Sequence, residues 1–324
     1  MNGHRYVVIF ALAFSLVLGG CAFVTIPLIS QPQPLEEQVI EGDGAEKILI
    51  LTVSGIISDD GNSDPSFLRE PSIVEEITEA LKKARQDTAV KGLVLRINSP
   101  GGSVTASDIL YHELNTFRKA TGSKIIACLT DLGASGGYYI ATATDEIIAH
   151  PTTITGSISV IAVKFDIKGL LDLVGIKEET VKSGRLKDIW SPFRPSTDEE
   201  RQIMQGVIDS FHQRFVNVIA AGRPQLTREE IERLADGRIF TADQALETKL
   251  IDRVGYMDDA IDRLKLLLGI ASPKIITYSR PGTYRGTIYS EASHGLSGQI
   301  KVISHEGGTL RMPPRVQVMY LWMP

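Results

Sequence analysis

The chain has 324 residues, enough for one large domain or two of ordinary size. Hydrophobic residues make up 43% and charged residues 23% of it, close to the average of globular proteins, which excludes general disorder. A net charge of −5, with Lys and Arg dispersed, argues against a protein that binds nucleic acid by charge. Two cysteines exclude a disulfide framework, and the six histidines lack the H-x-x-x-H spacing of metalloproteases.

The first thirty residues are typical of an export signal. A charged start at 1–5 precedes an apolar run at 6–18, which has the length of a signal-peptide core. The run ends in Leu-Gly-Gly-Cys, which resembles the bacterial lipobox and predicts cleavage before Cys21 and lipidation of its thiol. The alternative is an uncleaved transmembrane helix, because apolar character resumes and reaches Ile29. Either anchor tethers the body to a membrane, outside the cytoplasm.

The chain divides into a signal, a linker, a body and a tail. Residues 1–20 are the signal, and residues 21–46 are predicted to be a tether, because 31–47 holds two prolines, five acids and two glycines. Residues 47–280 are expected to form the folded body. The Gly- and Ser-rich residues 281–324 are expected to be a loosely attached tail.

Strands and helices alternate through the body. Five short apolar runs with β-branched residues predict buried strands, at 48–53, 90–97, 124–129, 146–149 and 274–278. Apolar residues at helical spacing predict three longer helices, at 72–86, 105–118 and 198–221. Ser72 with Glu75 and Thr197 with Glu200 form capping boxes at two of their starts. The alternation indicates an α/β domain with a mostly parallel sheet and flanking helices.

The strongest local signal for chemistry is the glycine-rich segment 131–139, between a predicted strand and a run that suits a helix. Ser135 stands at this junction, where free backbone N–H groups of a helix N-terminus face whatever the serine attacks. Small neighbours also let a substrate backbone approach closely. The plainer alternative is a turn in which Ser135 only caps the helix.

A nucleophilic serine needs a base, and histidine is the first candidate. The pattern G-x-S-x-G around Ser135 fits the nucleophile elbow of α/β-hydrolases, which requires a downstream acid and a histidine. His212 falls within an amphipathic helix, His150 precedes a proline, and His294 and His305 lie in the tail. None of these histidines has the context of a catalytic loop, so an esterase triad is the weaker alternative.

Lysine is the other candidate base. Lys187 lies in a polar, glycine-containing loop ahead of Trp190 and Phe193. A lysine acts as a base only in its neutral form, which near pH 7 requires burial, and these two aromatic residues are placed to cover it. In isolation, a lysine in such a loop is more often an ordinary surface residue.

A second glycine-rich turn, at 99–102, directly follows a predicted strand. Its Gly-Gly pair permits positive φ angles and exposes N–H groups, which suits an oxyanion hole. An ordinary strand-to-helix loop explains the same residues equally well.

Six short strings together resemble the bacterial signal peptide peptidase A family, which are serine proteases with the ClpP/crotonase-like fold. They occur in family order over about 47–268, some two-thirds of the chain. They are NSPGG at 98–102, ASGGYY at 134–139, TGSI at 155–158, KSGRLKD at 182–188, SPFR at 191–194 and ADGR at 235–238. One such string is weak evidence, whereas six in order are specific.

The resemblance implies a role for each candidate. Ser135 is the nucleophile and Lys187 the general base of a Ser-Lys dyad, while Ser157 orients the lysine. The N–H groups of Gly102 and Gly136 form the oxyanion hole, and neither a metal nor a cofactor is needed. Family members with one copy of the domain assemble into homo-oligomers in which serine and lysine come from adjacent protomers. The implied substrates are hydrophobic peptides such as remnant signal peptides, cleaved in the bacterial cell envelope.

Two departures from the family pattern favour a third alternative, a membrane-tethered scaffold without peptidase activity. Ser159 stands where the family usually has glycine, and the bulky pair Ile189-Trp190 narrows access to the lysine. The tail raises a separate expectation, because its apolar end around Tyr320 is suited to occupy the protein's own cleft.

Overall fold

The computed structural model describes residues 33–60, 71–281, 286–290 and 318–322. The predicted signal and Cys21 lie outside these residues. Within the described ranges, no helix is long and apolar enough to cross a membrane.

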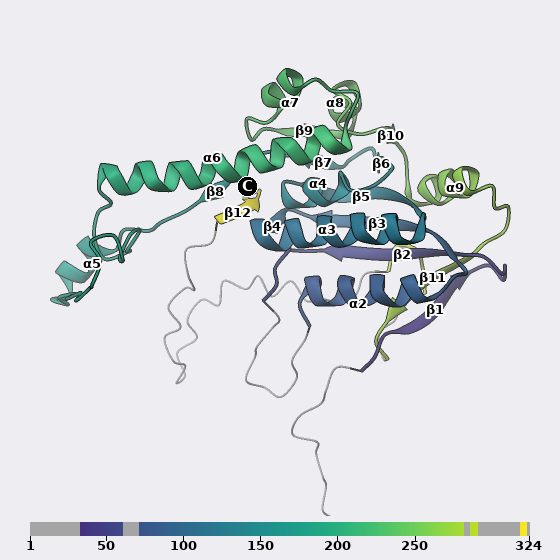
Figure 1. Ribbon diagram of the computed structural model, residues 1–324, viewed down its shortest axis with the longest axis horizontal. Helices are drawn as coiled ribbons and strands as arrows, with labels where there is room; N and C mark the ends of the chain where they lie inside the picture. The colour runs from purple at the N-terminus through teal and green to yellow at the C-terminus, as the bar shows by residue number, and fades with distance from the viewer. Residues whose placement is uncertain (1–32, 61–70, 282–285, 291–317, 323–324) are drawn as a thin grey trace, which may run out of the picture.

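A nine-stranded sheet forms the centre of the molecule (Figure 1). Its strands are β1 (Glu36–Glu41), β2 (Lys47–Ser54), β3 (Val90–Ser99), β5 (Lys124–Ala134), β6 (Glu146–Ala149), β7 (Ile154–Gly156), β9 (Ile239–Thr241), β10 (Arg253–Val254) and β11 (Lys274–Ser279). The main path runs β1-β11-β2-β3-β5-β6-β10, and β7 joins β5 to β9. Within this sheet, the pairs β1–β11 and β7–β9 are antiparallel and the other described pairs are parallel. The mostly parallel α/β sheet with flanking helices confirms the predicted fold class.

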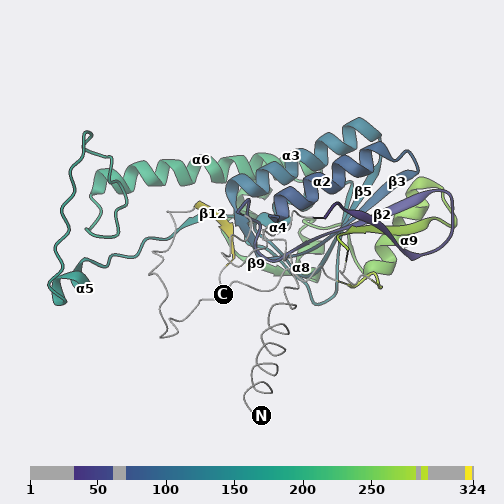
Figure 2. The same cartoon turned by 90° about the horizontal axis from the view of Figure 1, so that it is seen from below.

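Helices cover both faces of this sheet, which explains why central strands such as β2 carry a long run of apolar residues (Figures 1 and 2). One face carries α2 (Ile73–Gln86), α3 (Val104–Thr121) and α4 (Gly136–Ala141), and the other carries α9 (Met257–Leu268). Successive residues of a strand point to opposite faces. Leu93 and Leu95 accordingly pack in the core under α2 and α3, whereas Val94 between them packs against α9.

Both predicted capping boxes are present. Ser72 and Glu75 exchange side-chain and backbone hydrogen bonds at the start of α2, and Thr197 and Glu200 do the same at α6 (Asp198–Gly222). Each N-cap is worth about 1 kcal/mol. The remaining helices are α5 (Lys168–Leu173), α7 (Arg228–Leu234) and α8 (Ala242–Glu247).

Two segments outside residues 47–280 pair with strands of the fold. Leu35 is buried and β1 pairs with β11, so residues 36–41 form an edge strand of the sheet. The tail returns as β12 (Val318–Leu321), which forms a small antiparallel sheet between β4 (Gly101–Ser103) and β8 (Ile161–Ala162). Local composition predicts neither attachment, because each strand takes its partner from the far end of the chain.

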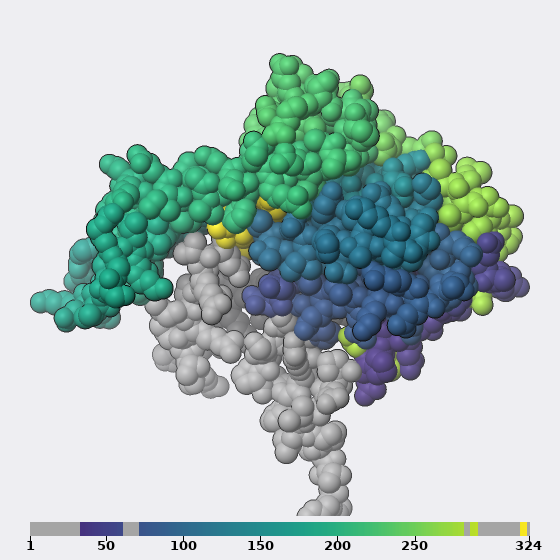
Figure 3. Space-filling view, in the orientation of Figure 1, coloured from purple at the N-terminus to yellow at the C-terminus, as the bar shows by residue number. Residues whose placement is uncertain are grey.

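Residues 163–197, which we call the arm, project from the body together with the N-terminal end of α6 (Figures 1 and 3). Apolar side chains on the arm face solvent: Phe165 is 75%, Leu173 85% and Val181 94% exposed. Monomeric proteins seldom leave several such side chains uncovered on one segment.

Candidate active site

Ser135 lies at the junction between β5 and α4, as the sequence predicts. Its φ and ψ are 54° and −115°, a conformation that costs a non-glycine residue about 1–3 kcal/mol. The backbone holds this shape from both sides: Ser135 N donates to Gly156 O (2.7 Å) and Tyr139 N donates to Ser135 O (2.8 Å). Ser135 Oγ is buried and has no hydrogen-bond partner among the described residues. Such strain at a buried, unpartnered hydroxyl is characteristic of a reactive position.

The predicted oxyanion-hole residues lie against Ser135. A Cβ placed on Gly136 would lie 3.1 Å from Gly102 N, and one on Gly101 would lie 2.7 Å from Gly136 N. Gly101 has a φ of 101°, so glycine is required there for conformation as well as for space. The structure therefore places the N–H groups of Gly102 and Gly136 side by side, next to the serine.

Ser157 is the third predicted residue at this place. β7 pairs with β5 so that Gly156 is opposite Ala134, which puts Ser157 and Ser135 at neighbouring positions just beyond the ladder. Ser157 also has a positive φ of 50°, and its N–H donates to Arg238 O (2.7 Å) in the ADGR string. The strings around 135, 157 and 238, separate in sequence, thus meet at one site.

The C-terminal strand β12 lies along β4 beside this site. Tyr320 is opposite Gly102, and Trp322 N donates to Pro100 O (2.9 Å). Hydrogen-bonded pairs recur every second residue in an antiparallel ladder, so the Gly102 N–H faces the Tyr320 carbonyl. A Cβ on Gly101 would lie 2.0 Å from that carbonyl oxygen. A backbone carbonyl of the chain itself therefore lies next to both predicted oxyanion-hole amides.

The side chain of Tyr320 fills an aromatic pocket and is fully buried. Its ring stacks on Tyr139 with centroids 5.1 Å apart and lies 4.7 Å from the ring of Phe215. Its hydroxyl donates to Phe211 O (2.8 Å). Burial, and then the nearby Asp108 carboxylate, raise the pKa of the Tyr320 hydroxyl.

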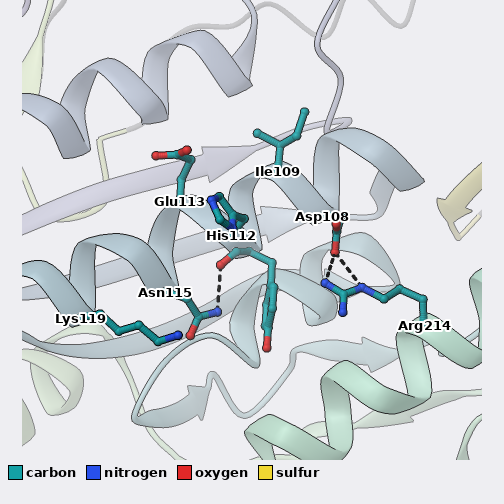
Figure 4. Close-up of a pocket in the computed structure, with 8 residues that line it drawn as sticks. Asp108, Ile109, His112, Glu113, Asn115, Lys119 and Arg214 are labelled. Atoms are coloured by element: carbon teal, nitrogen blue, oxygen red, sulfur yellow. Dashed lines mark hydrogen bonds and ion pairs between the residues drawn. The ribbon is translucent and has the colours of Figure 1, made fainter.

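An ion pair between α3 and α6 holds the Tyr139 side chain, whose ring stacks on Tyr320. Arg214 donates to Asp108 Oδ1 from Nη2 (2.8 Å) and from Nε (3.1 Å) (Figure 4). The Tyr139 hydroxyl donates to the same oxygen. The pair borders a groove of about 470 Å³ that also contains His112 and Lys119. Sequence reasoning missed Asp108 and Arg214, because 106 residues separate them and neither lies in a glycine-rich motif.

Lys187 is exposed and is not close to Ser135 in this chain. Its neighbour Asp188 accepts from Arg194 Nε (2.9 Å), and Arg194 Nη1 donates to Glu200 (3.0 Å), which ties the loop to the start of α6. The ring of Phe215, fifteen residues further along α6, contacts Tyr139, so the loop lies about 22 Å along the helix from the pocket. Figures 1 and 2 show the same separation between the arm and α4. Covering of Lys187 by the arm's own aromatic residues is therefore not observed.

None of the three described histidines contacts Ser135 Oγ. His212 Nε2 lies 2.8 Å from Ala235 O, and His150 packs against the rings of Tyr256 and Tyr289. The described histidines therefore supply no base for the esterase alternative, and His294 and His305 lie outside the described residues. Cys128 is a buried free thiol, and burial raises its pKa to about 12.

Comparison with known proteins identifies relatives of the whole body. Residues 117–271 match the model of peptidase family S49. A protein from Enterococcus faecium that carries the name signal peptide peptidase SppA is 39% identical over 248 residues, which cover 76% of this chain and 71% of the relative. Protease 4 of Salmonella typhi is 34% identical over 219 residues, 68% of this chain but 34% of the relative. The chloroplastic serine protease SPPA of Arabidopsis thaliana is 31% identical over 259 residues, 79% of this chain and 38% of the relative.

Proposed function

Because the chain belongs to the signal peptide peptidase A family, peptidase family S49, and is a serine protease, we propose that it cleaves hydrophobic peptides with Ser135 as its nucleophile. One observation carries this proposal. An extended apolar segment, β12, lies antiparallel on β4 with a carbonyl beside the Gly102 and Gly136 amides. A substrate that adds a strand at the same edge presents its scissile carbonyl to the same two donors.

The chemistry is acyl transfer. Ser135 Oγ attacks the carbonyl carbon while a lysine accepts the hydroxyl proton, and the carbonyl oxygen becomes an oxyanion held by the two amides. Collapse of the intermediate breaks the C–N bond, and the lysine returns the proton to the leaving amine. Water, deprotonated by the same lysine, then hydrolyses the acyl-enzyme. The strain at Ser135 supports this role because it presents Oγ at the start of α4, toward an approaching carbonyl.

We assign the lysine to Lys187 of a neighbouring copy. Within one protomer the loop of Lys187 is about 22 Å from the pocket along α6, and Lys187 is exposed. The arm that carries it projects from the body and displays Phe165, Leu173 and Val181. Packing the arm against a second copy covers these apolar side chains and desolvates Lys187, which favours its neutral form. Ser157, beside Ser135, is then placed to orient the incoming amine.

Mixed oligomers test this assignment. Ser135→Ala and Lys187→Ala chains are co-expressed in equal amounts, and hydrolysis of a hydrophobic peptide is measured against each variant alone. If the dyad spans two protomers, half of the sites keep the serine and half of their neighbours keep the lysine, so about a quarter of wild-type activity returns. A dyad within one chain restores none. Lys177→Ala, another exposed lysine of the arm, is the matched control and keeps full activity.

We infer that β12 is an intramolecular ligand of the active site, in line with its burial and its pairing with β4. The segment occupies the position of a substrate strand, so the full-length enzyme is autoinhibited. A chain that ends at Met312 is then more active than the full chain.

The proposed setting is the bacterial cell envelope, with the body outside the cytoplasm and tethered through Cys21. Tethering beside the bilayer raises the effective concentration of remnant signal peptides. Metabolic labelling with a fatty acid tests the anchor: lipidation predicts label in wild type and none in Cys21→Ala, whereas an uncleaved helix predicts label in neither. A serine-directed acylating reagent tests the scaffold alternative, which predicts no labelling of Ser135 even in the chain that ends at Met312.

A further inference from the structure

Ser99 is fully buried three residues before Gly102, which carries one of the two proposed oxyanion-hole amides. Its hydroxyl bridges two stretches of backbone, because Ser99 Oγ donates to Gly55 O (2.6 Å) and accepts from Gly101 N (3.0 Å). Gly101 O is a second acceptor at 3.4 Å, but a hydroxyl has one proton and Gly55 O is closer. The Ser99 side chain thus joins the turn after β2 to the loop that carries Gly102.

The hydrogen bond from Gly101 fixes the orientation of one peptide unit of this loop. In a trans peptide the N–H and C=O groups point in opposite directions, and none of the described peptide bonds is cis. The Gly101 N–H points inward to Ser99 Oγ, so the Pro100 carbonyl of the same unit points outward. There it accepts from Trp322 N (2.9 Å), which follows β12. Ser99 therefore directs a carbonyl toward the strand that lies along β4.

The next peptide unit carries the proposed oxyanion-hole amide. Its carbonyl, Gly101 O, accepts from Ile57 N (2.9 Å), so its N–H, which belongs to Gly102, points away from residue 57. Ile57 lies in the turn after β2 that Ser99 Oγ holds through Gly55 O. Glycines have no Cβ to restrain rotation, and Gly101 has a φ of 101°. Hydrogen bonds to neighbouring backbone and to Ser99 therefore decide where the Gly102 N–H points.

Ser99 also contacts the start of α4. A Cβ placed on Gly137 would lie 2.8 Å from Ser99 O and 3.4 Å from Ser99 Cβ. Gly137 directly follows Gly136, whose N–H is the second proposed oxyanion-hole amide. One buried serine thus packs against both segments that supply these amides.

We propose that Ser99 is a positioning residue, whose hydroxyl keeps the Gly102 N–H directed at the oxyanion that forms when the serine attacks. The inference rests on the proposed function, in which the amides of Gly102 and Gly136 stabilise that oxyanion. Without the hydroxyl, the Gly101 N–H loses its acceptor and the two glycine peptide units are free to turn. The loss falls on the transition state, because the oxyanion exists only there and in the intermediate that follows.

Ser99→Ala in the full-length enzyme tests this role, with initial rates measured over a range of concentrations of a hydrophobic peptide. Removal of one oxyanion-hole donor lowers kcat about 100- to 1,000-fold. Ser99→Ala misaligns the donor without removing it, so we expect kcat to fall about tenfold to 100-fold. The apparent KM is expected to change little, because substrate and β12 use the same Pro100 carbonyl and both lose its alignment.

A transition-state analogue separates this effect from a change in substrate binding. A peptide aldehyde of the same sequence forms a hemiacetal with the nucleophilic serine, and its oxygen occupies the oxyanion hole. We expect the ratio of its Ki to KM to rise about tenfold to 100-fold in Ser99→Ala, in parallel with the fall in kcat. Competition by β12 raises Ki and KM by the same factor, so it cancels in this ratio.

The matched control is Thr277→Val, which removes another buried hydroxyl that donates to a backbone carbonyl, Ile50 O (3.0 Å). Thr277 lies on β11, which β2 separates from β3 and the loop after it. This variant is expected to lower the melting temperature without changing kcat or the ratio of Ki to KM. A merely structural role of Ser99 predicts the same behaviour for Ser99→Ala.

The outcomes distinguish this role from the proposed function. A kcat of Ser99→Ala close to that of wild type, or an unchanged ratio of Ki to KM, overturns the positioning role. If Ser99→Ala does not fold, Ser99→Cys, whose thiol fills the space but is only a weak acceptor, is measured against the same two criteria. If Ser135→Ala still cleaves, the proposed function itself fails. If Ser135→Ala is inactive while Ser99→Ala behaves as wild type, only the role of Ser99 fails.

Discussion

Replacing Tyr320 by alanine is expected to activate the enzyme. The tyrosine is fully buried between Tyr139 and Phe215, and it is the largest side chain by which β12 is held. Truncating a buried aromatic side chain to alanine costs about 3–5 kcal/mol. At 1.4 kcal/mol per factor of ten, the lower figure already weakens docking of β12 on β4 more than a hundredfold.

This weakening has a defined kinetic signature. If β12 competes with substrate, as we propose, its release lowers the apparent KM and leaves kcat unchanged. The gain in kcat/KM is limited by how completely β12 occupies the site in wild type, and it equals the gain in a chain that ends at Met312. Initial rates over a range of peptide concentrations give both constants for the two variants.

The control is Tyr289→Ala. This tyrosine also follows residue 280, but it is 45% exposed and its ring contacts His150. It is expected to behave as wild type. If Tyr320→Ala lowers kcat, or leaves KM unchanged while the protein remains folded, β12 supports the site and does not compete with substrate. That result refutes the reasoning.

Three further predictions concern single residues. Ser135→Gly is expected to abolish turnover yet raise the free energy of unfolding by about 1 kcal/mol over Ser135→Ala, because glycine adopts the positive φ without strain, and thermal denaturation of the two variants checks this. Arg214→Met releases Asp108 and Tyr139 and is expected to raise the KM for hydrophobic peptides several-fold with little change in kcat, measured in the chain that ends at Met312. The thiol of Cys128 is expected to resist alkylation at pH 8 until the chain unfolds, because burial raises its pKa to about 12. The pKa of this thiol is therefore higher in the folded than in the unfolded chain. Its contribution to the free energy of unfolding is present below pH 9 and is lost as the pH rises toward 12.

Local pattern was sufficient for the central strands β2, β3 and β5 and for the long helices α2, α3 and α6. Apolar runs with β-branched residues indicate buried strands, and capping boxes such as Ser72 with Glu75 depend on residues three apart, so both could be predicted from local sequence. The edge strands of the sheet could not be predicted in this way. β1 is acidic and short, and it is a strand because the β11 edge accepts it, which no property of residues 36–41 reveals.

The sequence by itself determined the family, because six short strings in family order are specific. The glycine-rich turns at Gly101 and Ser135 were predictable as well, since positive φ and close backbone approach restrict which residues fit there. The roles of Ser135, Gly102 and Gly136 are what the family resemblance implies, and they stay predictions. Only the tertiary structure decided how the site is completed. In the structure, α6 separates the loop of Lys187 from the pocket beside Ser135. Tyr320 lies opposite Gly102, and Asp108 forms an ion pair with Arg214. Each of these depends on contacts between residues far apart in the chain, which packing selects and local sequence does not encode.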